Sequence, residues 1–542
     1  VFTYCTMGSP HDQFYFKRPN LMVTGAVTPP RLDLTNEDLL RAHIQSIWLA
    51  ESGLSLGISL KDLLDLSGDE PGLKALDFVQ DALDSDGTRK RAFQRAKAVL
   101  STIEDELKKV DWYSGTWLEG VLNHIPLSFD LACKRWRSLY RAAKGQQKAQ
   151  QKIINDHSRS KPDHDQAKRL RTEAESQIEL LTDTENLIQS DFYSYRYFAS
   201  EGFLPGYSFP RLPLSAFIPG RKMRGDRDEF LSRPRFLAIS EFGPRSIVYH
   251  EGSRYLINKV NLPVAESGEG LSTSRAKQCP TCGYFHPISS GDGPDRCERC
   301  NSMLDIPLAS LFRLQNVSTR RRDRISSDEE ERMRQGFELQ TAIRFQETQA
   351  GEFSAQSAKL MNEGTQIARL TYAGAATLWR INLGWRRRSN PSQMGFMLDI
   401  ERGYWAKEND QDDDPNDPMS ARAMRVIPYV EDTKNSLLFE PTTPLTSGQM
   451  ASLQAALKAA IQVSYQLEDN ELSAEPLPAA DERRMILFYE SAEGGAGVLR
   501  RLLDDPRAFA EVAQTALGLC HFNPLTGEDL RRSPDAAEDC EA

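Results

Sequence analysis

Two closely spaced pairs of cysteines are the residues in this sequence whose types and spacing most clearly allow chemistry. Each pair has the form C-x2-C, and the four residues are Cys279, Cys282, Cys297 and Cys300. Four thiolates are a ligand set that tetrahedral zinc prefers, and they leave no open position for a substrate. Gly283 and Asn301 follow the two pairs and tolerate the left-handed backbone of a tight turn whose N–H groups point at the sulfurs. The spacing predicts a structural zinc ribbon.

Other interpretations of these cysteines have less support. Two unrelated pairs would not be expected at so specific a spacing, and no thioredoxin-like βαβ pattern surrounds them to favour a redox C-x-x-C motif. His286 is a possible extra ligand, but four cysteines leave it no vacancy.

A run of arginines in residues 311–339 could bind phosphate. Its basic members are Arg313, Arg320, Arg321, Arg322 and Arg324. Guanidinium forks match phosphate oxygens and position a protein on a nucleic-acid backbone. An acidic run at 328–331 follows. An internal salt-bridge network between the two runs explains the same residues equally well.

A second basic cluster places Trp385 directly before Arg386, Arg387 and Arg388. An exposed tryptophan beside three arginines is suited to stacking on a base while the arginines neutralise the backbone. A buried core tryptophan is the alternative, and the sequence does not decide between them.

Enzyme motifs are mostly absent. The sequence has no P-loop, DEAD or DEAH box, HExxH or GxSxG motif, and the EGGAG turn at 493–497 lacks the lysine and hydroxyl of a Walker A loop. Asp399, Glu490 and Glu493 could form a metal-dependent nuclease site, although no spacing supports this third interpretation.

Composition sets the broad class. The chain has 542 residues, 39% hydrophobic and 27% charged, with a net charge of −10, so we expect several soluble domains and local rather than uniform basic surfaces. Eight cysteines are too few for a disulfide scaffold and fit a reducing cytoplasm. No apolar run is long enough to span a membrane. The first residue is not Met, and the sequence ends just after Cys540. We therefore expect both ends to be cuts through a longer chain.

The chain is expected to be an α+β multidomain protein. The expected division is the end of a preceding α/β lobe (1–30), a helical or winged-helix-like region (31–98), a helical hairpin region (99–200), a β-rich domain (201–270), the zinc ribbon (271–310), a β-rich arginine-containing domain (311–440) and a C-terminal α/β module (441–542). Thr35 and Asp38 predict a helix N-cap, residues 235–242 read as a β-run, and the polar stretch 135–181 predicts a solvent-exposed hairpin.

Several of these segments resemble bacterial superfamily 2 DEAD/DEAH-type helicases that carry a C-terminal metal-binding module. Members include the mitomycin-repair helicase of bacilli and the helicase subunit of the DISARM anti-phage system. The resemblance is carried by FTYCTMGSPHDQFYFKRP, FLPGYSFPRLPL, EGSRYLINKVNLP, CPTCGYFHP with RCERC, LQNVSTRRRDRISSDEEERMRQGFEL, NLGWRRR and LFYESAEGGAGVLRRL. These segments are distributed along the chain from residue 2 to residue 502.

The resemblance implies a function and its partners. Residues 1–20 would finish a second RecA-like motor lobe, so the motor with its ATP and Mg would lie upstream and be missing here. The rest would be the DNA-binding half of an ATP-dependent helicase or translocase, in repair or anti-phage defence, acting on single-stranded or forked DNA. Cys520 and Cys540 would be the first two members of a second metal site. The alternatives are a zinc-stabilised scaffold that docks a defence- or repair-complex subunit, and the nuclease.

Overall fold

The computed structural model describes residues 5, 10–20, 36–108, 110, 112–182, 192–206, 213–220, 228–262, 271–324, 336–346, 353–390, 392–406, 419–420, 422–491, 495 and 497–530. Four features of the sequence lie outside the described residues: Thr35, Cys540, Glu493 and the acidic run at 328–331. For Arg324 only the backbone is described.

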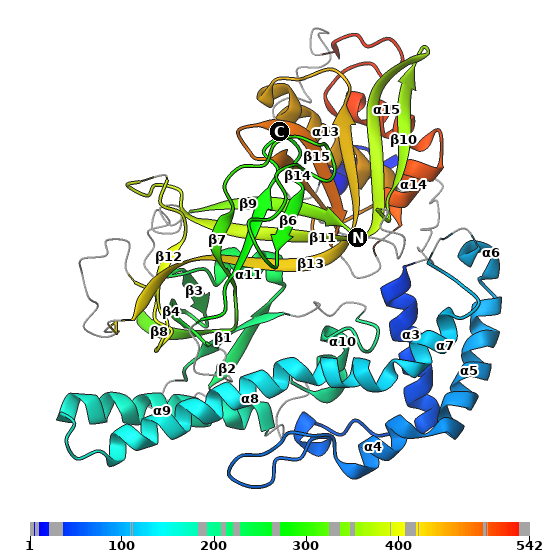
Figure 1. The fold of residues 1–542 in the computed structure, drawn as a ribbon. Coiled ribbons are helices and arrows are strands. Elements are labelled where there is room, and N and C mark those ends of the chain that lie inside the picture. Colours follow the sequence, from blue (N-terminus) through cyan, green and yellow to red (C-terminus); the bar gives the residue numbers. More distant parts are fainter. Residues whose placement is uncertain are drawn as a thin grey trace.

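The fold is mixed α+β, which confirms the expected class (Figure 1). The N-terminal part is helical, with α1 (Pro10–Lys17), α3 (Glu37–Ser52), η1 (Leu60–Asp62), α4 (Asp77–Asp84), α5 (Asp86–Ser101), α6 (Glu104–Leu107), α7 (Trp117–Asn123), α8 (Ile125–Asn155), α9 (Lys161–Thr182) and α10 (Ser194–Ser200). In residues 36–108 the β structure described is a single bridge, Leu64 with Ala75.

The helical part has one hydrophobic core, which includes three tryptophans. Trp48, Trp117 and Trp136 are buried in it. The indole N–H of Trp136 donates to the Leu181 carbonyl at 3.2 Å and ties α8 to the end of α9. Helix α3 begins after Asn36, whose side chain accepts from the Leu39 N–H at 2.9 Å, so the N-cap is one residue later than expected.

Helices α8 and α9 form the expected hairpin, which projects to the lower left of Figure 1. The expectation that it is simply solvent-exposed is wrong for α9. Small side chains, Ala167 and Ala174, are buried along it, and Gln177 Nε2 lies 3.5 Å from Ser318 Oγ on strand β8. Helix α9 therefore packs mainly against α8, and its C-terminal half also contacts β8.

The smaller sheet has the strand order β2-β1-β8-β4-β3. Its strands are β1 (Leu214–Ile218), β2 (Glu229–Arg233), β3 (Ile247–His250), β4 (Ser253–Val260) and β8 (Val317–Arg324). Residues 235–242 are not a strand, because α11 (Arg235–Glu241) is a helix that follows Pro234 and buries Ala238 and Ile239. A short apolar run fits a strand or a helix equally well, and here tertiary packing decides.

The larger sheet is organised by two long strands, β11 (Thr365–Trp385) and β13 (Ala423–Pro441), which pair antiparallel. Its other strands are β5 (Ser274–Gln278), β6 (Phe285–Ile288), β7 (Leu308–Arg313), β9 (Phe337–Phe345), β10 (Gln356–Asn362), β12 (Phe396–Asp399), β14 (Leu472–Pro478) and β15 (Arg483–Glu490). Strand β8 belongs to the smaller sheet and β5 to the larger one, so both sheets draw strands from several of the expected domains. The proposed domain boundaries remain a prediction.

The C-terminal α/β module is built as expected from a helix, a strand and a glycine turn. It contains α13 (Ser447–Tyr465), α14 (Val498–Asp504) and α15 (Ala508–Leu519) beside β14 and β15. Helix α13 starts with a capping box in which Thr446 and Gln449 exchange hydrogen bonds. Within the described residues, none of the helices combines the length and apolar character needed to cross a bilayer.

Candidate metal centre and nucleic-acid surface

Two tight turns present the four cysteines to one another. In the first turn the Gly283 N–H donates to the Cys279 carbonyl at 2.9 Å, and in the second the Asn301 N–H donates to the Cys297 carbonyl at 2.9 Å. Gly283 has φ +70° and Asn301 has φ +59°, so both residues take the left-handed backbone that the sequence predicts. Backbone N–H groups of Thr281 and Cys282 donate to the Cys279 sulfur.

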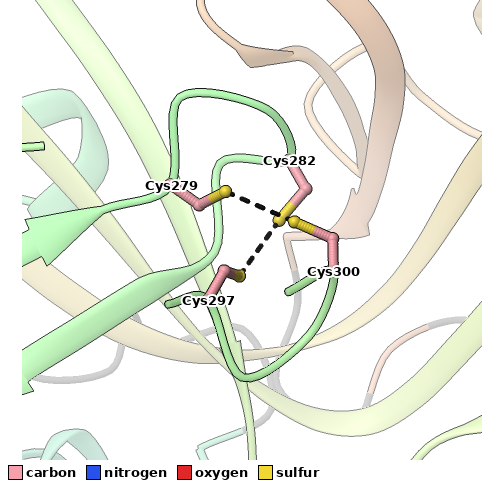
Figure 2. A group of neighbouring side chains, drawn as sticks. All are labelled: Cys279, Cys282, Cys297 and Cys300. Carbon is pink, nitrogen blue, oxygen red and sulfur yellow. Dashed lines mark hydrogen bonds between the residues drawn. The ribbon is translucent and has the colours of Figure 1, made fainter. Parts of the chain in front are cut away.

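The four sulfurs converge on one point (Figure 2). The Cys279 and Cys300 Sγ atoms lie 3.5 Å apart, the Cys282 and Cys297 Sγ atoms lie 3.6 Å apart, and all four lie within 4.8 Å of one another. Four sulfurs bound to one zinc ion at about 2.3 Å would be about 3.8 Å apart. A disulfide needs sulfurs about 2.05 Å apart, and all four cysteines are free. The set fits tetrahedral zinc.

The protonation of the cluster also suits a metal. Hydrogen bonds from Cys282 and Cys297 lower the pKa of Cys279, and the bond to Cys279 raises the pKa of Cys282. The hydrogen bonds within the cluster therefore favour the thiolate form of Cys279. A divalent cation would replace the thiol protons of the cluster and let each sulfur bind as a thiolate.

The cysteine cluster is part of a larger hydrophobic core. Cys279, Cys282 and Cys297 are buried with Leu477 of β14 and Met485 of β15. A Cβ atom placed on Gly283 would lie 2.9 Å from Leu477 Cδ2, so a side chain there would push the first turn off β14. The metal centre is therefore packed onto the C-terminal module.

An arginine that the sequence analysis did not single out strengthens this junction. Arg299, in the second C-x2-C turn, donates to Glu440 Oε2 on β13 at 3.0 Å and contacts Met485 Sδ at 3.4 Å. Burial lowers the pKa of Arg299, but Glu440 and Cys282 outweigh that effect, so the pKa is raised. The only sequence signal was a charged residue between two metal ligands.

His286 lies near the cysteine cluster without joining it. Its ring is buried, and burial lowers its pKa. The nearest charged group recorded for it is Glu298, with Nδ1 3.7 Å from the carboxylate. The cluster of four converging ligand atoms contains the cysteines alone, as the closed set predicts.

Strand β8 displays the first basic cluster in an alternating pattern. It pairs antiparallel with β4, so that Arg320 lies opposite Leu256 and Arg322 opposite Arg254. Arg320 is half-buried, whereas Arg321 and Arg322 are exposed. Adjacent strand residues point to opposite faces. Arg321 and Arg322 therefore point to opposite faces of this sheet and do not form one continuous patch by themselves.

Trp385 of the second cluster is half-buried and packs on a neighbouring aromatic residue. Its ring stacks on Phe337 with centroids 4.6 Å apart and meets Phe396 edge-on at 5.7 Å. Arg388 Nη1 lies 2.5 Å from Glu338 Oε2 and 3.0 Å from the Trp385 carbonyl. Trp385 therefore has a core-like contact on one ring face, and Arg386 and Arg387 are the exposed members.

The carboxylates considered for nuclease chemistry each have structural hydrogen bonds. Asp399 is buried and accepts from the Ser420 hydroxyl at 2.8 Å and from the backbone N–H groups of residues 401 and 402. Glu490 is buried and accepts from the Val498 N–H at 2.8 Å at the start of α14. Neither belongs to a group of converging metal-ligand atoms in the described part of the chain.

Cys520 lies at the C-terminal end of α15 and is exposed. Its expected partner, Cys540, lies outside the described residues, so the second metal site stays a prediction.

Comparisons with known proteins support the expected resemblance. Residues 453–541 match the family described as the MrfA Zn-binding domain. A solved structure described as the DUF1998 helicase MrfA bound to DNA is 11% identical, with a TM-score of 0.26. The match covers 62% of this chain and 32% of that one, so this chain spans about a third of that protein's length. No curated protein matches.

The matched segment and the cysteine cluster are different parts of the chain that touch. Residues 453–541 contain Cys520 and Cys540 but none of the four clustered cysteines. However, Leu477 and Met485, which pack on the cluster, lie inside the matched segment. The Zn-binding-domain match and the tetrathiolate both support zinc.

Proposed function

We propose that this chain is the DNA-binding, zinc-stabilised part of an ATP-dependent helicase or translocase of the MrfA type. The observation that carries the proposal is the match of residues 453–541 to the MrfA Zn-binding domain. An Mg-dependent ATPase motor would belong to the same full-length protein and would move DNA along this region. A role in DNA repair or in anti-phage defence is part of the proposal, as is a second metal site at Cys520 and Cys540.

The zinc would have a structural role. Cys279, Cys282, Cys297 and Cys300 would hold it as four thiolates, which leaves no position for a bound water. Because the cluster packs on β14 and β15, the ion would fix the ribbon against the matched C-terminal segment. The zinc ion would only cross-link the two cysteine turns.

The proposed DNA contacts are the exposed arginines at two places on the β structure. Arg321 and Arg322 lie on β8, and Arg386 and Arg387 follow the end of β11. Arginine forks bind phosphate without regard to sequence, so these contacts would position a strand and not read it. Trp385 would offer an edge or its second face, since Phe337 occupies the first.

The experiment is a salt titration of DNA binding. Fluorescence anisotropy with labelled single-stranded and forked oligonucleotides should show affinity that falls as salt rises. Three or four phosphate contacts predict a log–log slope of roughly −2 to −3 for single strands. An affinity that stays flat between low and moderate salt would contradict the proposal.

A second candidate, a protein-docking scaffold, is favoured by apolar side chains beside the metal centre. Met303 and Ile306 follow the second cysteine pair and are 61% and 90% exposed. A contiguous exposed apolar patch is typical of a protein-contact surface, and these two side chains would form part of one. Charge reversal at Arg320, Arg321 and Arg322 separates the candidates. A scaffold predicts intact DNA binding and lost co-purification of a partner subunit, whereas the first proposal predicts lost DNA binding.

A further inference from the structure

Two edge strands of the smaller sheet meet at one corner. In the order β2-β1-β8-β4-β3, strands β2 and β3 are at opposite ends. Even so, His250 Nε2, at the end of β3, lies 3.0 Å from Glu229 Oε2, at the start of β2. The sheet therefore curls until its two edges approach, and side chains cross the seam.

A third side chain joins this corner from the turn between β3 and β4. Glu251 has φ +43° and Gly252 φ +71°, the paired left-handed residues of a tight hairpin. The ligand atoms of Glu229, His250 and Glu251 all lie within 4.8 Å of one another.

The charges at the seam favour a cation. Two carboxylates this close repel each other when both are ionised. In the part of the chain that the structure describes, no Lys or Arg is recorded in an ion pair with Glu229 or Glu251. The one recorded partner of Glu229 is His250, which is charged only when protonated.

We propose that Glu229, His250 and Glu251 bind a divalent first-row transition-metal ion that clasps the seam of the smaller sheet. An imidazole nitrogen with two carboxylates suits zinc, cobalt, nickel or iron, whereas Mg²⁺ is usually bound through oxygen ligands alone. Three protein ligands leave positions for water. The side chains of Glu229 and His250 are 51% and 25% exposed, so the ion exchanges with solvent.

This site differs from the cysteine cluster in chemistry and in purpose. The cysteines form a closed, soft and largely buried set, whereas the seam offers an open site of nitrogen and oxygen ligands. The hairpin also places Ser253 opposite Arg324, so the ion would steady the end of β8, the arginine-bearing strand. Metal binding at this site would not require that the chain binds DNA.

Cobalt is the probe for this site. The full chain, first loaded with one equivalent of zinc to fill the cysteines, is titrated with Co²⁺ by calorimetry and visible absorption. We expect one equivalent with the weak absorption of nitrogen and oxygen coordination, separate from any cobalt at Cys520 and Cys540, which would show sulfur-to-cobalt absorption. His250→Ala and Glu229→Gln should each weaken it by at least about tenfold. His157→Ala, at an exposed histidine between α8 and α9, should bind cobalt as the wild type does.

Three results would overturn the proposal. One is a wild-type chain that takes up no further cobalt. Another is a folded Glu229→Gln or His250→Ala chain with wild-type affinity. The third is cobalt taken up only with strong sulfur-to-cobalt absorption that neither substitution changes, which would assign the ion to Cys520 and Cys540. Circular dichroism of each variant shows whether it is folded.

Discussion

Neighbouring residues of the same motif have different surroundings. An exposed residue can therefore contribute to DNA binding while a buried one contributes to the stability of the fold. In the cluster after Trp385, Arg387 is exposed, while the Arg388 side chain is 13% exposed and paired with Glu338. The sequence letters are identical. Their environments differ because Glu338 and Phe337 come from β9, far away in the chain.

Replacing these two arginines should therefore have different effects, one on DNA affinity and the other on the free energy of unfolding. Arg387→Ala removes one phosphate contact, so DNA affinity should fall a few-fold and the salt slope should become about 0.7 shallower for single strands. Arg388→Ala removes an ion pair between a largely buried arginine and the half-exposed Glu338, together with a hydrogen bond to the Trp385 carbonyl, so the free energy of unfolding should fall by about 1 kcal/mol.

Anisotropy and urea unfolding of both variants measure the two effects. A larger loss of DNA affinity in Arg388→Ala than in Arg387→Ala would contradict this assignment.

Gly495 shows how a glycine turn protects a buried carboxylate. A Cβ atom there would lie 1.7 Å from Glu490 Oε2 and 2.5 Å from Asn435 Nδ2, and the residue has φ +67°. Gly495→Ala should displace Glu490 from the N-terminus of α14 and cost about 2 kcal/mol or more.

The matched control is Gly448→Ala, because Gly448 lies in the first turn of α13 with open space around it. An alanine there should be neutral or stabilise by up to about 1 kcal/mol. Equal urea midpoints for the two variants would show that the turn does not constrain Glu490.

At the scale of elements, local patterns were predictable and long-range packing was not. The cysteine turns follow from Gly283 and Asn301, which lie beside the ligands in the sequence, and β15 and α14 appear where their apolar patterns indicate. Residues 235–242 form a helix because α11 packs on β11 and β13, which are distant in sequence. The buried residues of α9 are Ala167, Ala174, Gln177 and Leu181, so a single large apolar side chain is buried on it and its apolar signal was weak.

The curvature of the long strands could not be predicted from the sequence either. Strand β11 has 21 residues, and its side chains enter four different hydrophobic clusters along its length. Register shifts near Ala373 and Gly384 let it turn between them. The shape of such a strand depends on its neighbouring strands, and the sequence pattern does not reveal which strands these are.

The contact between the zinc turn and β14 gives a testable link between elements. Leu477 is fully buried against Gly283 and the cysteine cluster. Leu477→Ala should cost about 2–5 kcal/mol and should speed the transfer of zinc to a chelating dye. Leu517→Ala, at a position 39% exposed, is the control and should change neither property. Unchanged zinc release in a destabilised Leu477→Ala chain would show that the packing does not hold the metal.

At the scale of the whole molecule, the metal centre lies at a junction and not at an isolated tip. Arg299 joins it to β13, and Met485 joins it to β15. A helix of the N-terminal part reaches the same module, since Asn36 Nδ2 donates to Asn435 Oδ1 at 3.2 Å and Asn435 in turn donates to Glu490. Zinc should therefore influence regions beyond its own ribbon.

Removal of zinc tests whether the metal stabilises regions outside the ribbon. Chelation should increase hydrogen–deuterium exchange in β5 and β6 and also in β14 and β15, because all four strands lose a common packing centre. Helices α3 and α5 belong to a separate core and should keep their protection. Increased exchange confined to residues 274–301 would mean that the ribbon is mechanically independent.

The central claim, that one zinc ion joins four sulfurs at the junction of the ribbon and the C-terminal module, is tested most directly by X-ray absorption at the zinc edge. The chain carrying one equivalent of zinc should show a shell of four sulfur atoms at about 2.3 Å. A shell of nitrogen or oxygen atoms, or a chain that retains no zinc, would contradict the account.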